Sequence, residues 1–248
     1  MTVPQSVIFD IVCDNAGYEL FADLCLAHFL IAQEIIQKVR FHVKNMPWFI
    51  SDVTPKDFKY VIDACMKSTF SIEKPAVEGV SEARTITADN LRALGEQWDK
   101  FVQEGTFLVM DEEFWTTPHC FKDMKKIDYN MYRKLQYTVA VMYKGDLNYR
   151  KLLGERNCNP TLGLEAAMQG YIPCPAIAVR TVKSEVICGL PRGKWDQLNK
   201  INDKWMRTGE YGVIQYCNKG EPLKVADRPC IDYCKTCFGI ICPEHKDM

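Results

Sequence analysis

Residues 7–20 read VIFDIVCDNAGYEL, and this stretch decides the fold that we expect. Its first half, Val7 to Cys13, is a short apolar run rich in β-branched side chains, which is typical of a buried strand. A turn-forming segment follows, and then apolar residues recur at spacings of three or four: Leu20, Leu24, Ala27, Ile31 and Ile35. This spacing places them on one face of a helix. The chain therefore opens with a strand, a turn and a helix.

The same alternation continues along the chain. Further strands are expected at 39–43, 106–110, 137–143 and 176–182. The first of these extends through Trp48 to Ile50, and Val213 to Tyr216 adds an edge strand. Helical patterns separate the strands, while residues 68–90 and 111–127 are expected to be loops. Stacked strand–helix units predict an α/β fold: a three-layer α/β/α, Rossmann-like domain with a mostly parallel sheet.

Composition narrows the class of protein. The chain is 47% hydrophobic and 25% charged with a net charge of -1, which is typical of a globular protein with no overall field for nucleic acid or an anionic membrane. No apolar run reaches the length of a membrane span, and the N-terminus does not resemble a signal peptide. Seven of the twelve cysteines are scattered through apolar or turn segments, as in reduced proteins. We expect a cytoplasmic protein, with a nuclear alternative, and no oligomeric state is predicted.

Polar side chains follow the first two strands. Asp14 and Asn15 lie in the turn after the first strand, and Gly17 lets the backbone approach closely before the helix begins. Asp52 follows the second strand, just ahead of a helix that Thr54 caps. Two carboxylates and an amide oxygen suit Mg²⁺ or Mn²⁺. The structural alternative is that these residues only form turns and helix caps.

Two more polar clusters follow later strands. Residues 144–151 contain three cations with Asp146 and Asn148, a set that suits a phosphorylated, hydroxylated ligand. The last core strand ends in Arg180-Thr181-Val182-Lys183, where Lys183 can neutralise a phosphate. A solvated helix start and an exposed lysine are the alternatives. The carboxyl ends of parallel strands share one edge of the sheet, so the four clusters predict a joint metal and phosphate site.

With these residues in place, the chain resembles the damage-control phosphatase family, once known only as a domain of unknown function. The similarity extends to the sugar-phosphate phosphatase branch, which is also called acidic residue methyltransferase and carries an Arg-Thr-x-Lys motif. It covers nearly all of the chain before about residue 217. The matching stretches are residues 14–20, 42–44, 47–52, 114–119, 144–152, 180–183 and 211–216.

The resemblance implies a site and a reaction. Asp14, Asn15 and Asp52 would form the catalytic centre and hold a divalent metal, Mn²⁺, Co²⁺, Ni²⁺ or Mg²⁺. The substrates would be small sugar phosphates such as fructose 1-phosphate and fructose 6-phosphate, with a metal-bound water or Asp14 itself as the nucleophile. The implied substrate contacts are Asp14, Asn15, Asp146, Leu147, Asn148, Tyr149, Arg150 and Lys183.

Two departures from the family pattern define the expected domains. The helical region that precedes the first motif in this branch is missing, so residues 1–217 are expected to form the α/β phosphatase domain alone. Residues 218–248 are expected to form a short Cys-rich C-terminal tail. In that tail Cys234, Cys237, Cys242 and His245 supply four ligands suited to zinc. An unstructured extension is the alternative.

Two other classes of function stay open. One is S-adenosylmethionine-dependent methyl transfer to protein glutamate, the activity in the branch's alternative name, in which Glu19 would contact the cofactor. The other is a catalytically weakened or non-catalytic homologue, which the missing helical region favours.

Overall fold

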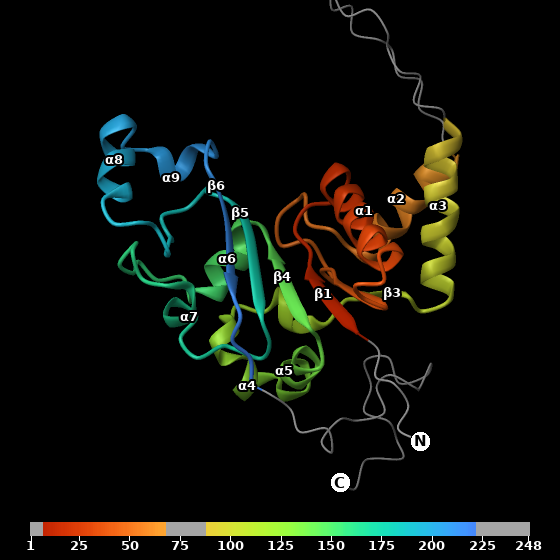
Figure 1. Ribbon diagram of the computed structural model, residues 1–248, viewed down its shortest axis with the longest axis horizontal. Helices are drawn as coiled ribbons and strands as arrows, with labels where there is room; N and C mark the ends of the chain where they lie inside the picture. The colour runs from red at the N-terminus through yellow and green to blue at the C-terminus, as the bar shows by residue number, and fades with distance from the viewer. Residues whose placement is uncertain (1–6, 68–87, 222–248) are drawn as a thin grey trace, which may run out of the picture.

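The computed structural model describes residues 7–67 and 88–221 of the chain. In this part a six-stranded sheet has the order β3-β2-β1-β4-β5-β6 (Figure 1). The first five strands run parallel, and β6 pairs antiparallel with β5. The strands are β1 (Ile8–Val12), β2 (Lys38–His42), β3 (Phe107–Met110), β4 (Ala140–Lys144), β5 (Ala176–Thr181) and β6 (Gly212–Cys217).

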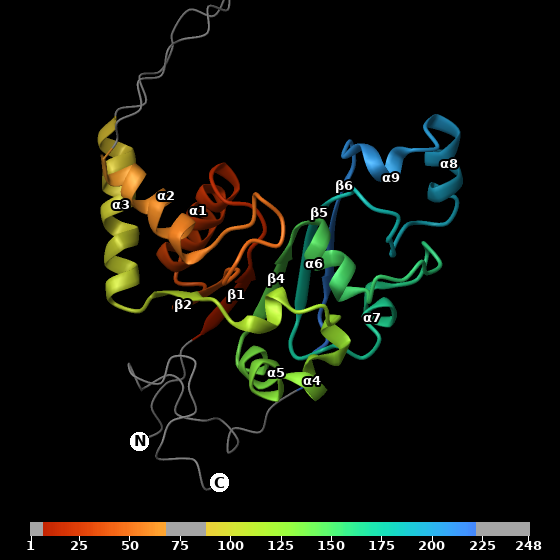
Figure 2. The ribbon, with the colours of Figure 1, turned by 180° about the vertical axis from the view of Figure 1, so that it is seen from behind.

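Helices cover both faces of the sheet (Figures 1 and 2). One face packs against α1 (Tyr18–Ala32), α2 (Pro55–Lys67) and α3 (Ala88–Gln103). The other packs against α4 (Met124–Ile127), α5 (Tyr129–Gln136), α6 (Gly145–Leu152) and α7 (Leu164–Ala167). Two more helices, α8 (Lys194–Ile201) and α9 (Trp205–Thr208), share a smaller core beyond β5. The α/β fold with a mostly parallel sheet is therefore confirmed.

The strand order fixes where a ligand site can form. From β1 the chain passes through α1 to β2 on one side, whereas β4, which lies on the other side of β1, continues into α6 and then β5. The two connections therefore leave the carboxyl ends of β1 and β4 in opposite directions. In open parallel sheets a crevice forms at such a point, and ligands bind there.

The start of α2 is as predicted. The backbone N–H and the hydroxyl of Thr54 both donate to the Asp57 carboxylate, at 3.0 and 2.7 Å, and Pro55 occupies the first helical position. A carboxylate three residues into the helix thus binds the residue that precedes it, as in a capping box. This cap fixes the chain directly after Asp52.

Three sequence-based expectations were wrong in detail. Helix α1 ends at Ala32, because Glu34 adopts a positive φ of 57°, so Ile36 is buried and Ile35 is 56% exposed. Residues 48–50 form an exposed turn, because the chain must double back to bring Asp52 to the first strand end. The expected loop at 111–127 contains two 3₁₀ turns (Glu113–Thr116 and Phe121–Asp123) and α4.

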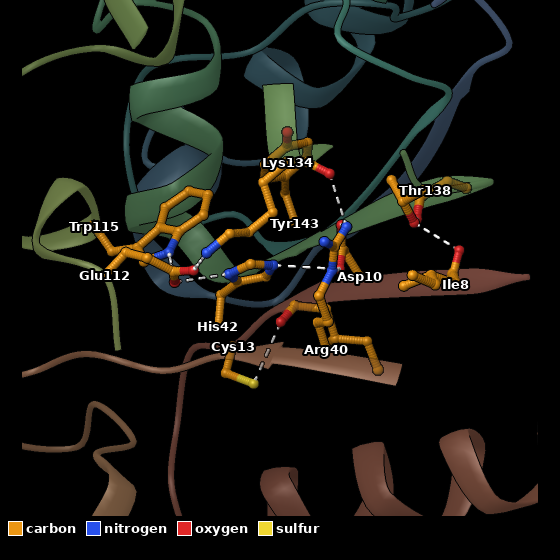
Figure 3. Close-up of polar contacts among 12 residues, drawn as sticks. Ile8, Asp10, Cys13, Arg40, His42, Glu112, Trp115, Lys134, Thr138 and Tyr143 are labelled. Carbon is orange, nitrogen blue, oxygen red and sulfur yellow. Dashed lines mark hydrogen bonds and ion pairs between the residues drawn. The ribbon is translucent and has the colours of Figure 1, made fainter. Parts of the chain in front are cut away.

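A cluster of buried charges lies within the face of the sheet that α5 covers (Figure 3). Asp10 and Arg40 are register partners on β1 and β2. The Arg40 guanidinium donates to both Asp10 oxygens, at 2.6 and 2.7 Å, and to the backbone carbonyl of Lys134. We call Asp10, Arg40, His42, Glu112 and Lys134 the Asp10 cluster.

His42 connects the two carboxylates of the Asp10 cluster. Its Nδ1 lies 3.1 Å from Glu112, and its Nε2 lies 3.4 Å from Asp10, an ion-pair distance without hydrogen-bond geometry. Lys134 donates to the other Glu112 oxygen at 2.5 Å. Burial disfavours the charged form of His42, but Glu112 and Asp10 outweigh it and raise the pKa of the imidazole. Burial likewise disfavours the carboxylate of Asp10, yet Arg40 and His42 lower its pKa.

Several expectations lie outside the described residues. They include most of the loop at 68–90 and all four tail residues proposed as zinc ligands, Cys234, Cys237, Cys242 and His245. The eight cysteines in the described ranges are free thiols. Among the helices of those ranges, none combines the length and the apolar character needed to cross a membrane.

Candidate active site

A cavity of about 780 Å³ opens at the carboxyl ends of β1, β4 and β5. Its lining includes Asp14, Asn15 and Asp52 from the first two clusters and Asp146, Arg150 and Lys183 from the later two. The sheet thus brings together residues from all four clusters that the sequence singled out. Apolar side chains, including Phe49, Leu147 and Ile214, form part of the wall between them.

A short backbone ladder joins the first two clusters. Asn15 and Asp52 form an isolated antiparallel bridge. The N–H of Ala16 donates to the Ser51 carbonyl at 2.8 Å, and the N–H of Val53 donates to the Asp14 carbonyl at 3.0 Å. Because these bonds fix the two segments to each other, Asp14 and Asp52 face one site although 38 positions separate them in the sequence.

Asp52 is almost fully buried, with 3% of its surface exposed. Its Oδ2 accepts the backbone N–H groups of Trp48 and Phe49, both at 2.8 Å. Its Oδ1 lies 3.4 Å from the Lys44 ammonium, which is itself buried. One oxygen of Asp52 therefore holds the 48–51 turn, and the other has only its long contact with the Lys44 ammonium.

Asn15 and Glu19 surround the Asp14 carboxylate. The Asn15 amide donates to Asp14 Oδ2 and to Glu19 Oε2, both at 2.9 Å. The Ser51 hydroxyl donates to Asn15 Oδ1 at 2.6 Å. Within the described residues, Asn15 is the sole donor to Asp14. The negative charge of the Asp14 carboxylate, which is partly buried, therefore has little compensation from hydrogen-bond donors.

Lys144 connects this end of the cavity to α1. Its ammonium donates to Glu19 at 2.9 Å and to Asp23 at 2.7 Å. Asp23 is 5% exposed, and its second oxygen has no hydrogen-bond partner. Burial disfavours a charged Lys144, but Asp23 and Glu19 outweigh that and raise its pKa. Lys144 is thus a buried cation held between two carboxylates.

Negative charge exceeds positive charge around Asp14. The Asp14 cluster, as we call it, consists of four carboxylates and two ammonium groups, a net charge of -2 when all are ionised: Asp14, Glu19, Asp23, Asp52, Lys44 and Lys144. Burial raises the pKa of Asp14 to about 6, and the negative charges of Glu19 and Asp52 add to this effect. Burial also raises the pKa of Asp23.

Gly145 lets the start of α6 approach Asp14. Its φ is +86°, and a Cβ built on it would lie 2.0 Å from Asp14 Oδ2. Only glycine adopts that φ without strain and leaves that space. The close approach of α6 therefore depends on this glycine.

The cavity lining also carries cations. Arg150 lines the cavity and donates to Glu155 at 2.8 and 2.9 Å, and Lys183 lies exposed at the end of β5. Asp146 accepts from Arg180 at 2.7 Å and from the N–H of Lys183 at 3.1 Å. The lining therefore combines cations with a carboxylate, as expected for a ligand with both phosphate and hydroxyl groups.

Two of the substrate contacts implied by the resemblance lie away from the cavity. Residues 145–152 form α6 rather than a loop, and a helix turns some of its side chains inward. Asn148 is 1% exposed and donates to the carbonyls of Cys13 and Lys144. Tyr149 is equally buried and donates to Gln215 at 2.8 Å. Both side chains hold neighbouring segments through buried hydrogen bonds, whereas Asp146, Leu147 and Arg150 line the cavity.

Sequence reasoning missed two members of the Asp14 cluster. Asp23 was not singled out, although Glu19 and Asp23 are four residues apart on one helix and must share a face. Lys44 appeared only within a matched stretch, and its burial against Asp52 follows from the 48–51 turn. The signal available for Asp23 was a carboxylate on the apolar face of α1, next to Leu20, Leu24 and Ala27.

The donor set around Asp14 fits a divalent cation. In the described ranges no three His, Cys, Asp or Glu side chains form a ready metal cluster, so an ion also needs the Asn15 amide oxygen or water as ligands. Amide nitrogen and oxygen are nearly indistinguishable in shape, and the Ser51 hydroxyl can accept as well as donate. The Asn15 amide can therefore turn its oxygen toward Asp14 when a cation replaces the hydrogen bonds that it donates there.

The fold and the cavity define a doubly wound α/β domain with a polar ligand site at its topological switch point. Residues 2–198 match the family described as "Damage-control phosphatase ARMT1-like domain". The chain belongs to this family, so the resemblance drawn from its motifs is confirmed.

Curated relatives agree with this family. The chain is similar to proteins named "Damage-control phosphatase ARMT1" from three species. It is 39% identical to the Danio rerio protein over 84% of this chain and 42% of that protein. It is 36% identical to the Mus musculus protein over 87% of this chain and 45% of that protein. It is 34% identical to the Homo sapiens protein over 83% of this chain and 43% of that protein. The chain therefore spans less than half the length of these relatives.

Proposed function

We propose that this chain is a metal-dependent phosphatase that hydrolyses small sugar phosphates, with fructose 1-phosphate and fructose 6-phosphate as its substrates. The observation that carries the proposal is one cavity lined both by carboxylates of the net negative Asp14 cluster and by the cations Arg150 and Lys183. The carboxylates would hold a divalent cation that balances their charge, and the cationic side chains would neutralise the phosphate of an ester.

Asp14, Asn15 and Asp52 would hold the metal. Asp14 offers a carboxylate with one donor, Asp52 offers the oxygen that has only a long contact to Lys44, and Asn15 offers its amide oxygen. Oxygen ligands of this kind suit Mn²⁺, Co²⁺, Ni²⁺ or Mg²⁺. When bound, the metal supplies Lewis-acid polarisation of a phosphoryl oxygen.

The remaining residues orient the substrate. Lys183 neutralises phosphate charge, and Arg150 adds a second cation near it, although Glu155 competes for its guanidinium. Asp146 accepts hydrogen bonds from sugar hydroxyls, and Leu147 packs against the sugar ring. At neutral pH Asp14 is mostly ionised, because its pKa is about 6, and so it can accept a proton from an attacking water or attack the phosphorus itself.

Phosphate release from fructose 1-phosphate tests the proposal. We expect turnover with Mn²⁺ or Co²⁺, no turnover after chelation, and none in Asp14→Ala. The matched control is Asp63→Ala, because Asp63 on α2 does not line the cavity and, among the described residues, its ion pair is with Lys59. The control should keep full activity.

Two results would replace the proposal. An absence of turnover with all four metals would leave a non-catalytic binding protein. Methyl transfer from S-adenosylmethionine to protein glutamate that survives Asp14→Ala would favour the transferase. Glu19 makes the second outcome unexpected, since its carboxylate already accepts from Asn15 and Lys144.

A further inference from the structure

We infer that Arg180 is a positioning residue, which holds Asp146 and residues 183–186 in place as the substrate-facing wall and does not itself bind the substrate's phosphate. The inference rests on the proposed function, because Asp146 and Lys183 are the groups through which it acts. An arginine at the end of a strand beside a phosphate site would ordinarily be taken as a phosphate ligand. Arg180 lies at the cavity lining, but its contacts argue against that role.

All three nitrogen atoms of the Arg180 guanidinium bind groups of the protein. Nε donates to Asp146 at 2.7 Å, and Nη1 donates to the Val186 carbonyl. Nη2 donates to the carbonyl and the hydroxyl of Ser184, both at 2.8 Å. The side chain is 0% exposed. Four of its five N–H groups are thus occupied, and a phosphate that bound the guanidinium in fork geometry would displace some of these partners and leave buried carbonyls unsatisfied.

An aromatic ring fixes the plane of the guanidinium. The Arg180 Cζ lies 4.4 Å from the centre of the Tyr149 ring, a favourable cation–π distance. The ring is in turn held at its hydroxyl, which donates to Gln215 on β6 and accepts the N–H of Cys188. Tyr149 thus supports Arg180, which explains why a buried tyrosine lies beside a substrate site without reaching it.

Arg180 orients Asp146 toward the cavity. Asp146 Oδ1 accepts three donors: Arg180 Nε, the backbone N–H of Lys183 and the Ser184 hydroxyl. Within the described residues no donor reaches Oδ2. Because the first oxygen is saturated, the second is the acceptor that remains for a ligand hydroxyl.

The same contacts place Lys183. Its backbone N–H binds Asp146, and the two carbonyls that Arg180 binds belong to Ser184 and Val186, which follow it. The Lys183 side chain remains exposed and lines the cavity. One buried guanidinium therefore fixes both the Asp146 carboxylate and the backbone that carries the Lys183 side chain.

A comparison of KM and kcat for fructose 1-phosphate tests this role. Arg180→Lys keeps the positive charge but cannot bind Asp146, Ser184 and Val186 together. We expect KM to rise about tenfold, the scale of one charge-assisted hydrogen bond, with kcat and the affinity for Mn²⁺ changed about twofold or less. Ser184→Ala removes one partner without burying a charge and should raise KM about threefold. Arg156→Lys is the control, since Arg156 is exposed and does not line the cavity.

A double-mutant cycle separates positioning from simple stability. If Arg180 acts through Asp146, Asp146→Asn should raise KM, and adding Arg180→Lys to it should raise KM little further. A phosphate ligand at Arg180 would instead give multiplicative effects and a larger loss of affinity for inorganic phosphate in Arg180→Lys than in Asp146→Asn. Either result, or an unchanged KM with a lower melting temperature, overturns the inference.

The inference can fail separately from the proposed phosphatase activity. If no turnover occurs, calorimetric titration with fructose 1-phosphate in the presence of Mn²⁺ still gives a Kd for each variant. A wild-type chain that binds without turnover would contradict the proposed activity, and a tenfold weaker Kd in Arg180→Lys would still support the positioning role. A wild-type chain that does not bind the ester would overturn both.

Discussion

The Asp10 cluster and the Asp14 cluster belong to the same sheet, yet their charges are arranged in opposite ways. In the Asp10 cluster two carboxylates, Asp10 and Glu112, face Arg40, Lys134 and a His42 whose pKa is raised. In the Asp14 cluster four carboxylates face two ammonium groups. Asp10, Arg40 and His42 of the first cluster are buried (Figure 3), whereas Asp14, Glu19, Asp52 and Lys144 of the second line the cavity.

The pKa values express this difference. Cationic partners lower the pKa of Asp10 in spite of its complete burial, while burial and negative neighbours raise that of Asp14 to about 6. In the Asp10 cluster the cations match or outnumber the carboxylates, so no excess negative charge is available to bind a cation. An excess of buried negative charge, in contrast, lowers stability until a cation binds. Charge balance therefore separates a structural cluster from a ligand site.

A substitution in the Asp10 cluster should give the largest effect on stability. Asp10→Asn leaves Arg40 as an uncompensated buried cation, so we predict a loss of roughly 3–5 kcal/mol in the free energy of unfolding. Urea denaturation of the wild type and of Asp63→Asn provides the comparison, and the control should change by less than about 0.5 kcal/mol. A loss below about 1 kcal/mol in Asp10→Asn would mean that the network contributes little to stability.

The corresponding Asp-to-Asn substitution in the Asp14 cluster should have the opposite effect and raise the free energy of unfolding. Because the folded state raises the pKa of Asp14, it binds more protons than the unfolded state between about pH 4 and 6. The stability of the metal-free protein then falls as the pH rises through this window. Asp14→Asn should reduce that fall and raise the free energy of unfolding at pH 7 by on the order of 1–2 kcal/mol. The pKa of Asp23 is also raised, so in Asp14→Asn this residue still contributes to the pH dependence of stability.

This prediction is checked by urea denaturation at a series of pH values with a chelator present. A metal-free Asp14→Asn variant that is less stable than the wild type at pH 7 would contradict the view that negative charge is in excess around Asp14.

His42 should give the smallest effect, a pH dependence on the alkaline side. Its pKa is higher in the folded state, so its stabilising contribution is complete below the unfolded value of about 6.5 and is lost as the pH rises through the folded value. Asp10, Glu112, Arg40 and Lys134 are the charged groups around it. We predict that the wild type loses stability above about pH 6.5 and that His42→Gln loses less over the same range. Parallel curves for the two proteins would show that His42 is not protonated in the folded state.

The sequence could predict the parts of the fold and of the site that depend on local signals. The order of strands and helices, the capping box at Thr54 and the positions of Asp14, Asn15 and Asp52 at strand ends follow from periodicity and turn residues. In a parallel sheet strand ends share an edge, which was enough to place these residues near one another.

The sequence could not predict which side chains point inward. Asn148 and Tyr149 directly follow Asp146 and Leu147 on a short helix, whose rotation depends on packing against β4 and β5 and on hydrogen bonds to Cys13 and Gln215. Asp10 is hidden in an apolar strand, and only its pairing with Arg40 in the neighbouring strand explains its presence. The 48–51 turn exposes Trp48 and Phe49 because Asp52 binds their backbone N–H groups, a contact without a local sequence pattern.

Titration of the metal-free protein with Mn²⁺, followed by calorimetry, tests the central claim most directly. The claim is that the Asp14 cluster lacks positive charge and holds a divalent cation. We predict that the wild type and Asp63→Asn each bind one Mn²⁺ with the same affinity, and that Asp14→Asn binds it at least about a hundredfold more weakly, a loss of roughly 2.7 kcal/mol. Binding of equal affinity in Asp14→Asn, or no binding in the wild type, would contradict the claim.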